Sequence, residues 1–183
     1  MNLADALKLL GDALPDVGTL ARLLVAALIG GVLGFDRERK DKPAGLRTHM
    51  LVSLGSATFV LLGFEMSAEF SEQGQPALDP TRVLQGVVGG IGFLGAGSII
   101  QARGQVSGVT TAASVWMAGA LGSAAGMGAH AIALAATLLA VLVLTALRRL
   151  ELSLRPSASG RDSEDSDPDL RGTPTHKPKA EPS

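Results

Sequence analysis

Residues 83–102 read VLQGVVGGIGFLGAGSIIQA, a stretch without a single Asp, Glu, Lys or Arg. The apolar character continues beyond it, because Arg103 is the only formally charged residue between Val83 and Leu147. One charge in 65 residues is too few for the solvated surface of an ordinary soluble domain. This part of the chain therefore predicts helices that span a membrane.

The composition of the whole chain of 183 residues agrees with this interpretation. Charged residues make up 18%, against about 25% in an average soluble domain, and hydrophobic residues make up 46%. The chain has no cysteine, which excludes disulfides, zinc–thiolate centres and thiol catalysis. Its formal net charge of -1 gives no reason to expect nucleic-acid binding.

Five apolar segments are candidate spans, which predicts an all-α, polytopic membrane helical bundle. Each has 16 to 19 residues, against about 20 for an untilted span, so the shorter ones need flanking side chains such as Arg22 that reach the interface. Together they form a predicted membrane domain over residues 20–150. The predicted spans are residues 20–35, 48–64, 83–100, 109–126 and 129–147.

The two ends of the chain differ from this domain. In the N-terminal segment 1–19, leucines recur at helical spacing from Leu3 to Leu14, which indicates an amphipathic helix at the membrane surface or a frayed leader. The acidic residues among these leucines do not fit a cleavable signal. Residues 151–183 are rich in Pro, Ser and charged residues, which predicts a disordered cytoplasmic tail.

Basic residues fall on alternate connections between the spans. The connection 36–47 carries five Lys and Arg residues, whereas 65–82 carries four acidic residues and one Arg. Arg148 and Arg149 follow the last span. Because basic loops stay in the cytoplasm, five spans place the N-terminus outside and the C-terminus inside. A four-span alternative would put two basic segments on opposite sides of the membrane.

The third span is unusually rich in glycine. Gly86, Gly90 and Gly97 fall on one helical face, which predicts close packing against a neighbouring helix. Residues 90–95 also match the G-x-G-x-x-G pattern, but the strand and the βαβ unit of a dinucleotide site are missing. An alternative is a helix that unwinds and exposes carbonyls to an ion. Small residues recur in the same way at Gly30, Gly34, Ala118, Gly122 and Gly126.

Polar residues collect at the ends of the spans, and two clusters are candidate functional sites. At the cytoplasmic face we expect either a small charged pocket or a simple topology anchor, with Asp36 or Glu38 within about 4 Å of Arg47. His49 and His130 each stand alone and are interpreted as interfacial. The cytoplasmic cluster is Asp36, Glu38, Arg47, Thr48, Thr110 and Thr111, and the second cluster is Asp79, Arg82 and Gln85.

Three motifs in order resemble the signatures of the MgtC/SapB family. They are DRER at 36–39 with KPAGLRTH at 42–49, DPTRV at 79–83 with GIGFLGAG at 90–97, and VSGVTTAA at 106–113. The resemblance implies a bacterial inner-membrane protein with four or five spans. Some members are linked to growth at low magnesium, one branch is thought to act on the F-type ATP synthase, and the family was long labelled as magnesium transport.

The chain also departs from the family pattern in two ways. Asp36 stands where the family often has Glu, and the tail replaces the soluble C-terminal domain of the virulence-associated branch. The chain is therefore more similar to the short SapB-type members.

Three functions fit these observations to different degrees. The first is a regulator that binds another inner-membrane complex, and the second is a transporter or channel for Mg²⁺ or another cation. The third, an intramembrane enzyme, lacks any nucleophile–base constellation, so we expect no enzyme. The expected partners are the lipid bilayer, another membrane complex and a second copy of the chain, without nucleic acid. No cofactor is expected, although Mg²⁺ remains a candidate ligand.

Overall fold

The computed structural model describes residues 15–76, 79–102 and 105–147, and within them the chain is all-α apart from one short hairpin. A π-helical turn, η1, directly continues the last helix. The elements are α2 (Val17–Glu38), α3 (Leu46–Glu72), α4 (Thr81–Gly97), β1 (Ile100–Ala102), β2 (Gln105–Ser107), α5 (Val109–Gly126), α6 (His130–Leu142) and η1 (Val143–Leu147).

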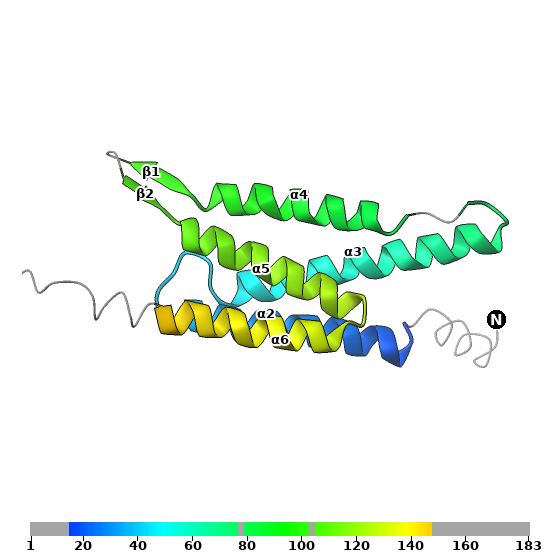
Figure 1. Ribbon diagram of the computed structural model, residues 1–183, viewed down its shortest axis with the longest axis horizontal. Helices are drawn as coiled ribbons and strands as arrows, with labels where there is room; N and C mark the ends of the chain where they lie inside the picture. Colours follow the sequence, from blue (N-terminus) through cyan, green and yellow to red (C-terminus); the bar gives the residue numbers. More distant parts are fainter. Residues whose placement is uncertain (1–14, 77–78, 103–104, 148–183) are drawn as a thin grey trace, which may run out of the picture.

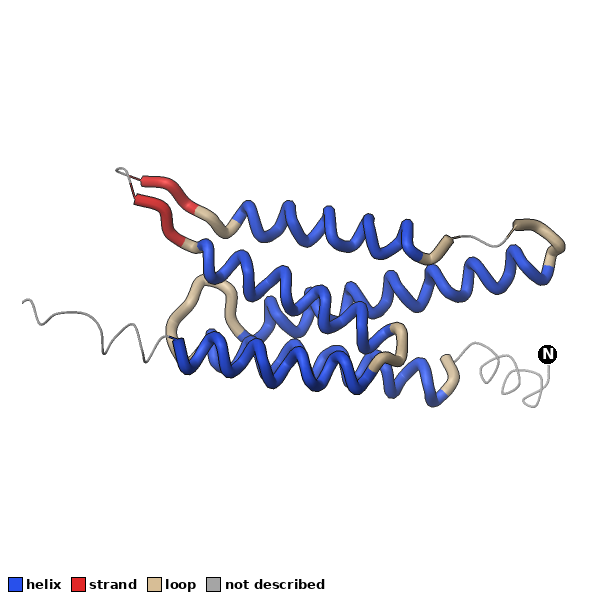
Figure 2. The backbone as a smooth tube through the Cα atoms, viewed as in Figure 1, coloured by secondary structure: helices blue, strands red, loops and turns tan. Residues whose placement is uncertain are grey.

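The five described helices lie roughly along one axis and form an elongated bundle (Figure 1). Helix α5 is its centre, because it packs against α2, α3, α4 and α6. Ten of the 18 residues of α5 are buried, whereas α4 buries only Val87, Ile91 and Gly95. The antiparallel strands β1 and β2 project from one end of the bundle (Figure 2).

Small residues of α2 and α5, the two helices in which the sequence grouped Gly30, Gly34, Gly122 and Gly126, bring both helices into backbone contact with α3. A Cβ atom added at Gly30 would lie 2.5 Å from the carbonyl oxygen of His49, and one added at Gly126 would lie 2.8 Å from that of Ala57. Gly34 and Gly122 also face the backbone of α3. Ser53 of α3 faces both Gly30 of α2 and Gly122 of α5. Its hydroxyl donates to the Ala26 carbonyl of α2 at 2.7 Å. The core is therefore held by close helix approach rather than by large side chains.

The prediction for the glycine-rich helix α4 is wrong. A Cβ added at Gly86, Gly90 or Gly97 would meet no described atom within 4 Å, so these residues do not pack closely against another of the described helices. The packed face of α4 is instead that of Ile91, whose Cδ1 atom occupies the space above Gly119. Helical periodicity grouped the glycines correctly on a face, but it does not tell which face turns inward.

Most helix boundaries lie within about three residues of the predicted spans, but α3 continues to Glu72, eight residues beyond the predicted limit of 64. Helix α4 ends at Gly97, three residues before the predicted limit, because the Ser98 hydroxyl caps the Gly95 carbonyl at 2.7 Å and a hairpin follows. Two helices, Val17–Glu38 and Leu46–Glu72, are long and apolar enough to cross a membrane, and His130–Ala146 is a shorter apolar helix. Residues 1–14 of the predicted amphipathic segment 1–19 lie outside the described residues, as does the predicted tail 151–183; Val17 to Thr19 begin α2, and Asp16 is its N-cap.

Candidate functional site

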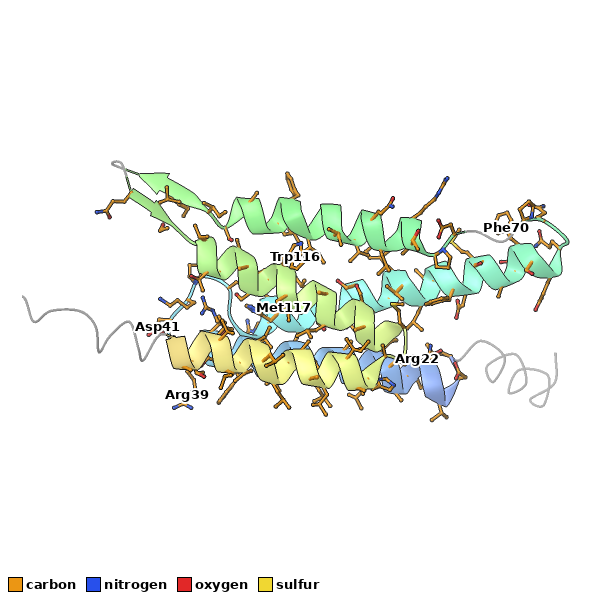
Figure 3. The ribbon with its side chains drawn as sticks, viewed as in Figure 1. Arg22, Arg39, Asp41, Phe70, Trp116 and Met117 are labelled. Atoms are coloured by element: carbon orange, nitrogen blue, oxygen red, sulfur yellow. The ribbon has the colours of Figure 1, made fainter. Side chains whose placement is uncertain are left out.

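Several elements meet at the end of the bundle from which the hairpin projects. Helix α2 ends there, the connection 39–45 turns the chain into α3, and α5 begins while η1 ends (Figure 1). Figure 3 places Arg39 and Asp41 at this end and Arg22 at the opposite one, where its guanidinium donates to the Gly126 carbonyl at 3.3 Å. The predicted cytoplasmic cluster is therefore brought to one end of the fold, and we call it the hairpin end.

Glu38 caps the following helix. Its Oε2 atom accepts the backbone N–H of Leu46 at 2.8 Å, at the start of α3, where an N–H group has no partner within the helix. The N-cap residue Gly45 supplies no side chain for this role, and a Cβ there would collide with the Glu38 carboxylate. The negative charge is also favourable beside the positive end of the helix dipole. Glu38 therefore fixes the turn between α2 and α3.

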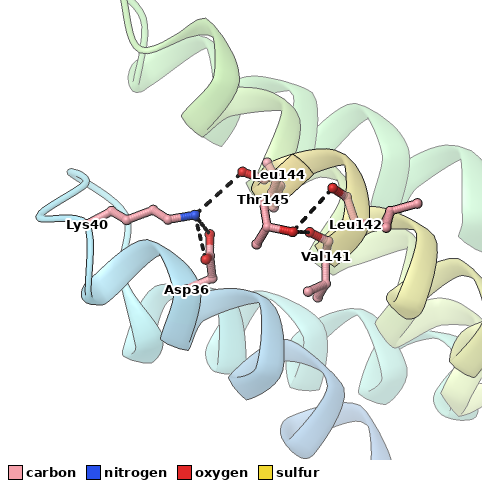
Figure 4. Close-up of polar contacts among 6 residues, drawn as sticks. All are labelled: Asp36, Lys40, Val141, Leu142, Leu144 and Thr145. Carbon is pink, nitrogen blue, oxygen red and sulfur yellow. Dashed lines mark hydrogen bonds and ion pairs between the residues drawn. The ribbon is translucent and has the colours of Figure 1, made fainter. Parts of the chain in front are cut away.

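Asp36, in the last turn of α2, forms an ion pair with Lys40, which lies two residues beyond the end of that helix. Its Oδ1 atom lies 2.6 Å from the Lys40 ammonium, which also donates to the Leu144 carbonyl of η1 at 3.5 Å (Figure 4). Thr145 in the same turn donates to the Val141 carbonyl at 2.7 Å. The pair is four residues apart and about one-fifth exposed, so its own contribution to stability is small. Its structural effect is to join the end of α2 to the end of α6.

The expected ion pair with Arg47 is wrong. The carboxylates of Asp36 and Glu38 are engaged by Lys40 and by the Leu46 amide, and Arg47 and Thr48 lie exposed on the first turn of α3. Sequence proximity suggested a cross-loop pair, but Lys40 lies only four residues from Asp36, just beyond the end of α2, so this pair requires no loop closure. Arg47 and Thr48 are therefore at the hairpin end without being part of a charged pocket.

A cavity of about 600 Å³ lies at the hairpin end, between the connection 39–45, the hairpin, the start of α5 and η1. Two basic residues line it: Arg37, whose side chain is buried at 4% exposure, and the exposed Lys42. Thr110 and the buried Thr111 line it from α5. This cavity differs from the charged pocket expected at this face, because Asp36, Glu38 and Arg47 are not among the residues that line it.

Gly108 directs α5 toward this cavity. Its φ of 89° lies in the left-handed region that glycine adopts readily, and a Cβ there would collide with the Ser98 carbonyl. The chain can therefore leave β2 and enter α5 within one residue. No side chain caps the first turn of α5.

His49 is a buried polar residue that sequence reasoning misplaced. It is fully buried, its Nδ1 atom lies 2.8 Å from the Gly45 carbonyl, and its Nε2 atom lies 3.1 Å from the Ser114 hydroxyl. These bonds tie the start of α3 to α5, next to Thr111, whose carbonyl accepts the Ser114 hydroxyl at 2.8 Å. A signal was available, because His49, Ser53 and Ser56 recur at helical spacing and form a polar stripe that faces inward.

The residues of the second predicted cluster lie at the start of helix α4. The Oδ1 atom of Asp79 accepts the hydroxyl of Thr81 at 2.7 Å and its backbone N–H at 2.9 Å, and these bonds lower the pKa of Asp79. Arg82 and Gln85 are exposed. Asp79 therefore orders the entry into α4 at the end of the bundle opposite to the hairpin.

Among residues 15–76, 79–102 and 105–147, no three His, Asp or Glu side chains come together in a way that could hold a metal ion. At the hairpin end, Glu38 acts in a helix cap and Asp36 acts in an ion pair. The geometry of this end is therefore that of a positively lined cavity.

Comparison with known proteins agrees with the motifs. The model of the MgtC family matches residues 23–153. The chain belongs to the MgtC family. It is 41% identical to protein SrpB of Synechococcus elongatus over 143 residues, which covers 74% of this chain and 78% of SrpB. No solved structure matches the chain.

Two further relatives carry names related to the family. The chain is 36% identical over 135 residues to the Escherichia coli (strain K12) protein named "Putative magnesium transporter YhiD", and 41% identical over 136 residues to protein MgtC of Brucella abortus (strain 2308). Each match covers 74% of this chain, but only 63% of YhiD and 54% of MgtC. The region shared with the MgtC family runs from α2 to η1 and so includes the cavity.

Proposed function

We propose that this member of the MgtC family is a non-enzymatic, multi-pass protein of the bacterial inner membrane with five spans, its N-terminus outside and its C-terminus in the cytoplasm. Large apolar side chains stay exposed on all five helices, for example Leu28, Phe59, Phe93 and Leu138. Exposed apolar surface of this extent is typical of contact with lipid or with another protein. The alternation of basic connections supports the orientation.

We further propose that the protein regulates another membrane complex in adaptation to low magnesium, instead of conducting ions. One observation carries this proposal: glycines of α4 open onto an unfilled apolar groove between α3 and α4. The groove has a volume of about 680 Å³, and Gly86, Gly90 and Leu94 line it opposite Gly55 and Phe59 of α3. A surface of small residues lets the helix of a partner approach closely.

The packing of the core favours regulation over transport. Backbone contacts at Gly30, Gly122 and Gly126 close the space between α2, α3 and α5. Mg²⁺ favours carboxylate oxygens, and the described parts of these three helices bring no carboxylate cluster together. A cation pathway through one copy of the chain would therefore require the core to separate. The alternative function, a transporter or channel, requires a pathway between several copies.

Two matched variants of α4 test the proposed regulatory role of the groove. Neither Gly90 nor Gly92 has an atom within 4 Å of an added Cβ, but only Gly90 lines the groove. In a strain deleted for its own MgtC-family gene, wild type and Gly92→Leu should restore growth at low magnesium, whereas Gly90→Leu should not. All three proteins should accumulate equally in the membrane.

Purified protein in liposomes that hold a fluorescent Mg²⁺ indicator separates the two functions. A regulator produces no flux above that of empty liposomes. Flux with wild type would establish transport instead. If Gly90→Leu and Gly92→Leu complement equally well, the groove does not take part in the regulatory function.

A further inference from the structure

The exposed face of α4 carries a seam of the kind that joins two parallel helices. Gly86, Gly90, Phe93 and Gly97 recur at intervals of four, three and four residues, and they fall within about 60° of one another around the helix. Phe93 is 80% exposed, more than any other large apolar side chain of α4. Helix α4 also lies at the edge of the bundle (Figure 1). These four residues, the α4 seam, thus combine bare glycines with one protruding aromatic ring.

We propose that a second copy of the chain packs on the α4 seam and that its Phe93 enters the apolar groove between α3 and α4. The groove has a volume of about 680 Å³, and an added Cβ at Gly86 or Gly90 in its wall would meet no described atom within 4 Å. This inference rests on the proposed regulatory function, because it names what fills the same groove while the regulated complex is absent.

The membrane restricts how two copies can meet. All copies insert with the same orientation, so a two-fold axis lies along the membrane normal and α4 packs parallel to α4 of the second copy. In such a pair, a residue on one flank of the seam faces the opposite flank of the other copy. Phe93 and Gly90 lie on opposite flanks of the seam, about 60° apart. A helical side chain leans toward the preceding turn, so each Phe93 reaches the level of Gly90 in the other copy.

The charges at the start of the seam are complementary under the same symmetry. Asp79 and Arg82 are both exposed there, three residues apart. A parallel pair puts the two helix starts side by side, so Arg82 of one copy lies at the level of Asp79 of the other, and the opposite charges pair reciprocally. In the described part of the chain, both bonds of Asp79 to Thr81 use Oδ1, which leaves Oδ2 for this pair. The groove itself has no charged residue in its lining, so the contact buries no charge.

Disulfide cross-linking tests the seam directly, because the chain has no cysteine of its own. In native membranes that contain the full chain, oxidation of Gly86→Cys should give a covalent dimer. The control Gly92→Cys is equally open but lies about 120° away around the helix, and it should stay monomeric. Equal cross-linking at both positions, or at neither, would overturn the proposal and leave the groove to lipid or to another protein.

Variants test the individual contacts in liposomes, with energy transfer between fluorescent copies measured as the protein is diluted with lipid. Phe93→Ala should weaken the dimer at least about tenfold, because it removes the aromatic anchor. The matched control Phe35→Ala, exposed on α2, should change it less than about twofold. Arg82→Glu, which places an acid opposite Asp79 of the second copy, should weaken the dimer more than Arg82→Gln. Equal effects of Phe93→Ala and Phe35→Ala, or a dimer strengthened by Arg82→Glu, would contradict the parallel seam.

Cross-linking and complementation together separate this inference from the proposed function. If Gly86→Cys gives no dimer while growth at low magnesium still depends on Gly90, the second copy is not the occupant and the regulatory role of the groove stands. If the dimer forms while Gly90→Leu and Gly92→Leu complement equally well, the second copy is the occupant and the regulatory role fails.

Discussion

The contact between α3 and α5 is tested by Gly122→Ala. A Cβ at this position would lie 2.7 Å from both the Cα and the carbonyl carbon of Ser53, and backbone cannot rotate away as a flexible side chain can. Overpacking of this kind costs about 1–3 kcal/mol. Displacing α3 also weakens the hydrogen bond from Ser53 to Ala26, which contributes about 1 kcal/mol. Because Ala exceeds Gly in helix propensity by about 1 kcal/mol, the net loss is about 1–3 kcal/mol.

The control is the same substitution at Gly92 of α4, where an added Cβ meets nothing within 4 Å. At that position only the higher helix propensity of alanine affects stability, so Gly92→Ala should stabilise the protein by about 0.5–1 kcal/mol. Thermal unfolding in detergent, followed by the fluorescence of the single tryptophan, Trp116, measures both. Gly122→Ala should lower Tm by several degrees, since about 1 kcal/mol corresponds to about 2–4 °C in a chain of this size. If Gly122→Ala unfolds at or above the wild-type temperature, the close contact of α5 with α3 is refuted.

Three further perturbations address the polar residues. Glu38→Ala should destabilise the protein by about 1 kcal/mol through loss of a helix cap, measured by the same unfolding, while Glu38→Gln, which keeps an acceptor for the Leu46 amide, should lose less. A double-mutant cycle of Asp36→Ala and Lys40→Ala should give a coupling of at most about 0.5 kcal/mol; a coupling above about 2 kcal/mol would contradict the partly exposed pair. The pKa of Asp79 is lower in the folded protein than in the unfolded chain. The stabilising effect of Asp79 is therefore present above its unfolded pKa and is lost as the pH falls through its folded pKa. As the pH is lowered, the protection from hydrogen exchange at the start of α4 should fall more in wild type than in Asp79→Asn.

Helical positions could be predicted from the sequence because they depend on local patterns of apolar residues. The described helices α3 and α5 begin within two residues of the predicted spans 48–64 and 109–126. The packing of Gly30, Gly34, Gly122 and Gly126 was predicted because small residues one turn apart in an apolar helix allow a neighbouring helix to approach closely. These features need no knowledge of which helices are neighbours.

The direction of a helix face and the partners of charged residues could not be predicted in this way. Gly86, Gly90 and Gly97 share a face, but the contact between Ile91 and Gly119 turns that face away from the core. Asp36 was expected to contact Arg47, but Lys40, four residues from Asp36 and just beyond the end of α2, forms the pair. Arg37 lines a cavity together with residues of the hairpin and of η1, which lie far from it in the sequence. Each of these outcomes depends on tertiary neighbours.

Helix α4 lines the apolar groove, and the residue directly after it lines the cavity at the hairpin end, which has a physical consequence. Its middle turns line the apolar groove through Gly86 and Gly90, and Ser98, directly after its last residue, lines the cavity with Arg37. The helix is fixed mainly by the packing of Val87, Ile91 and Gly95, a much smaller buried face than that of α5. Displacement of α4 by a partner in the groove would therefore move one wall of the cavity. By linkage, a ligand with different affinities for the two positions of α4 would change the affinity for the partner by the same factor.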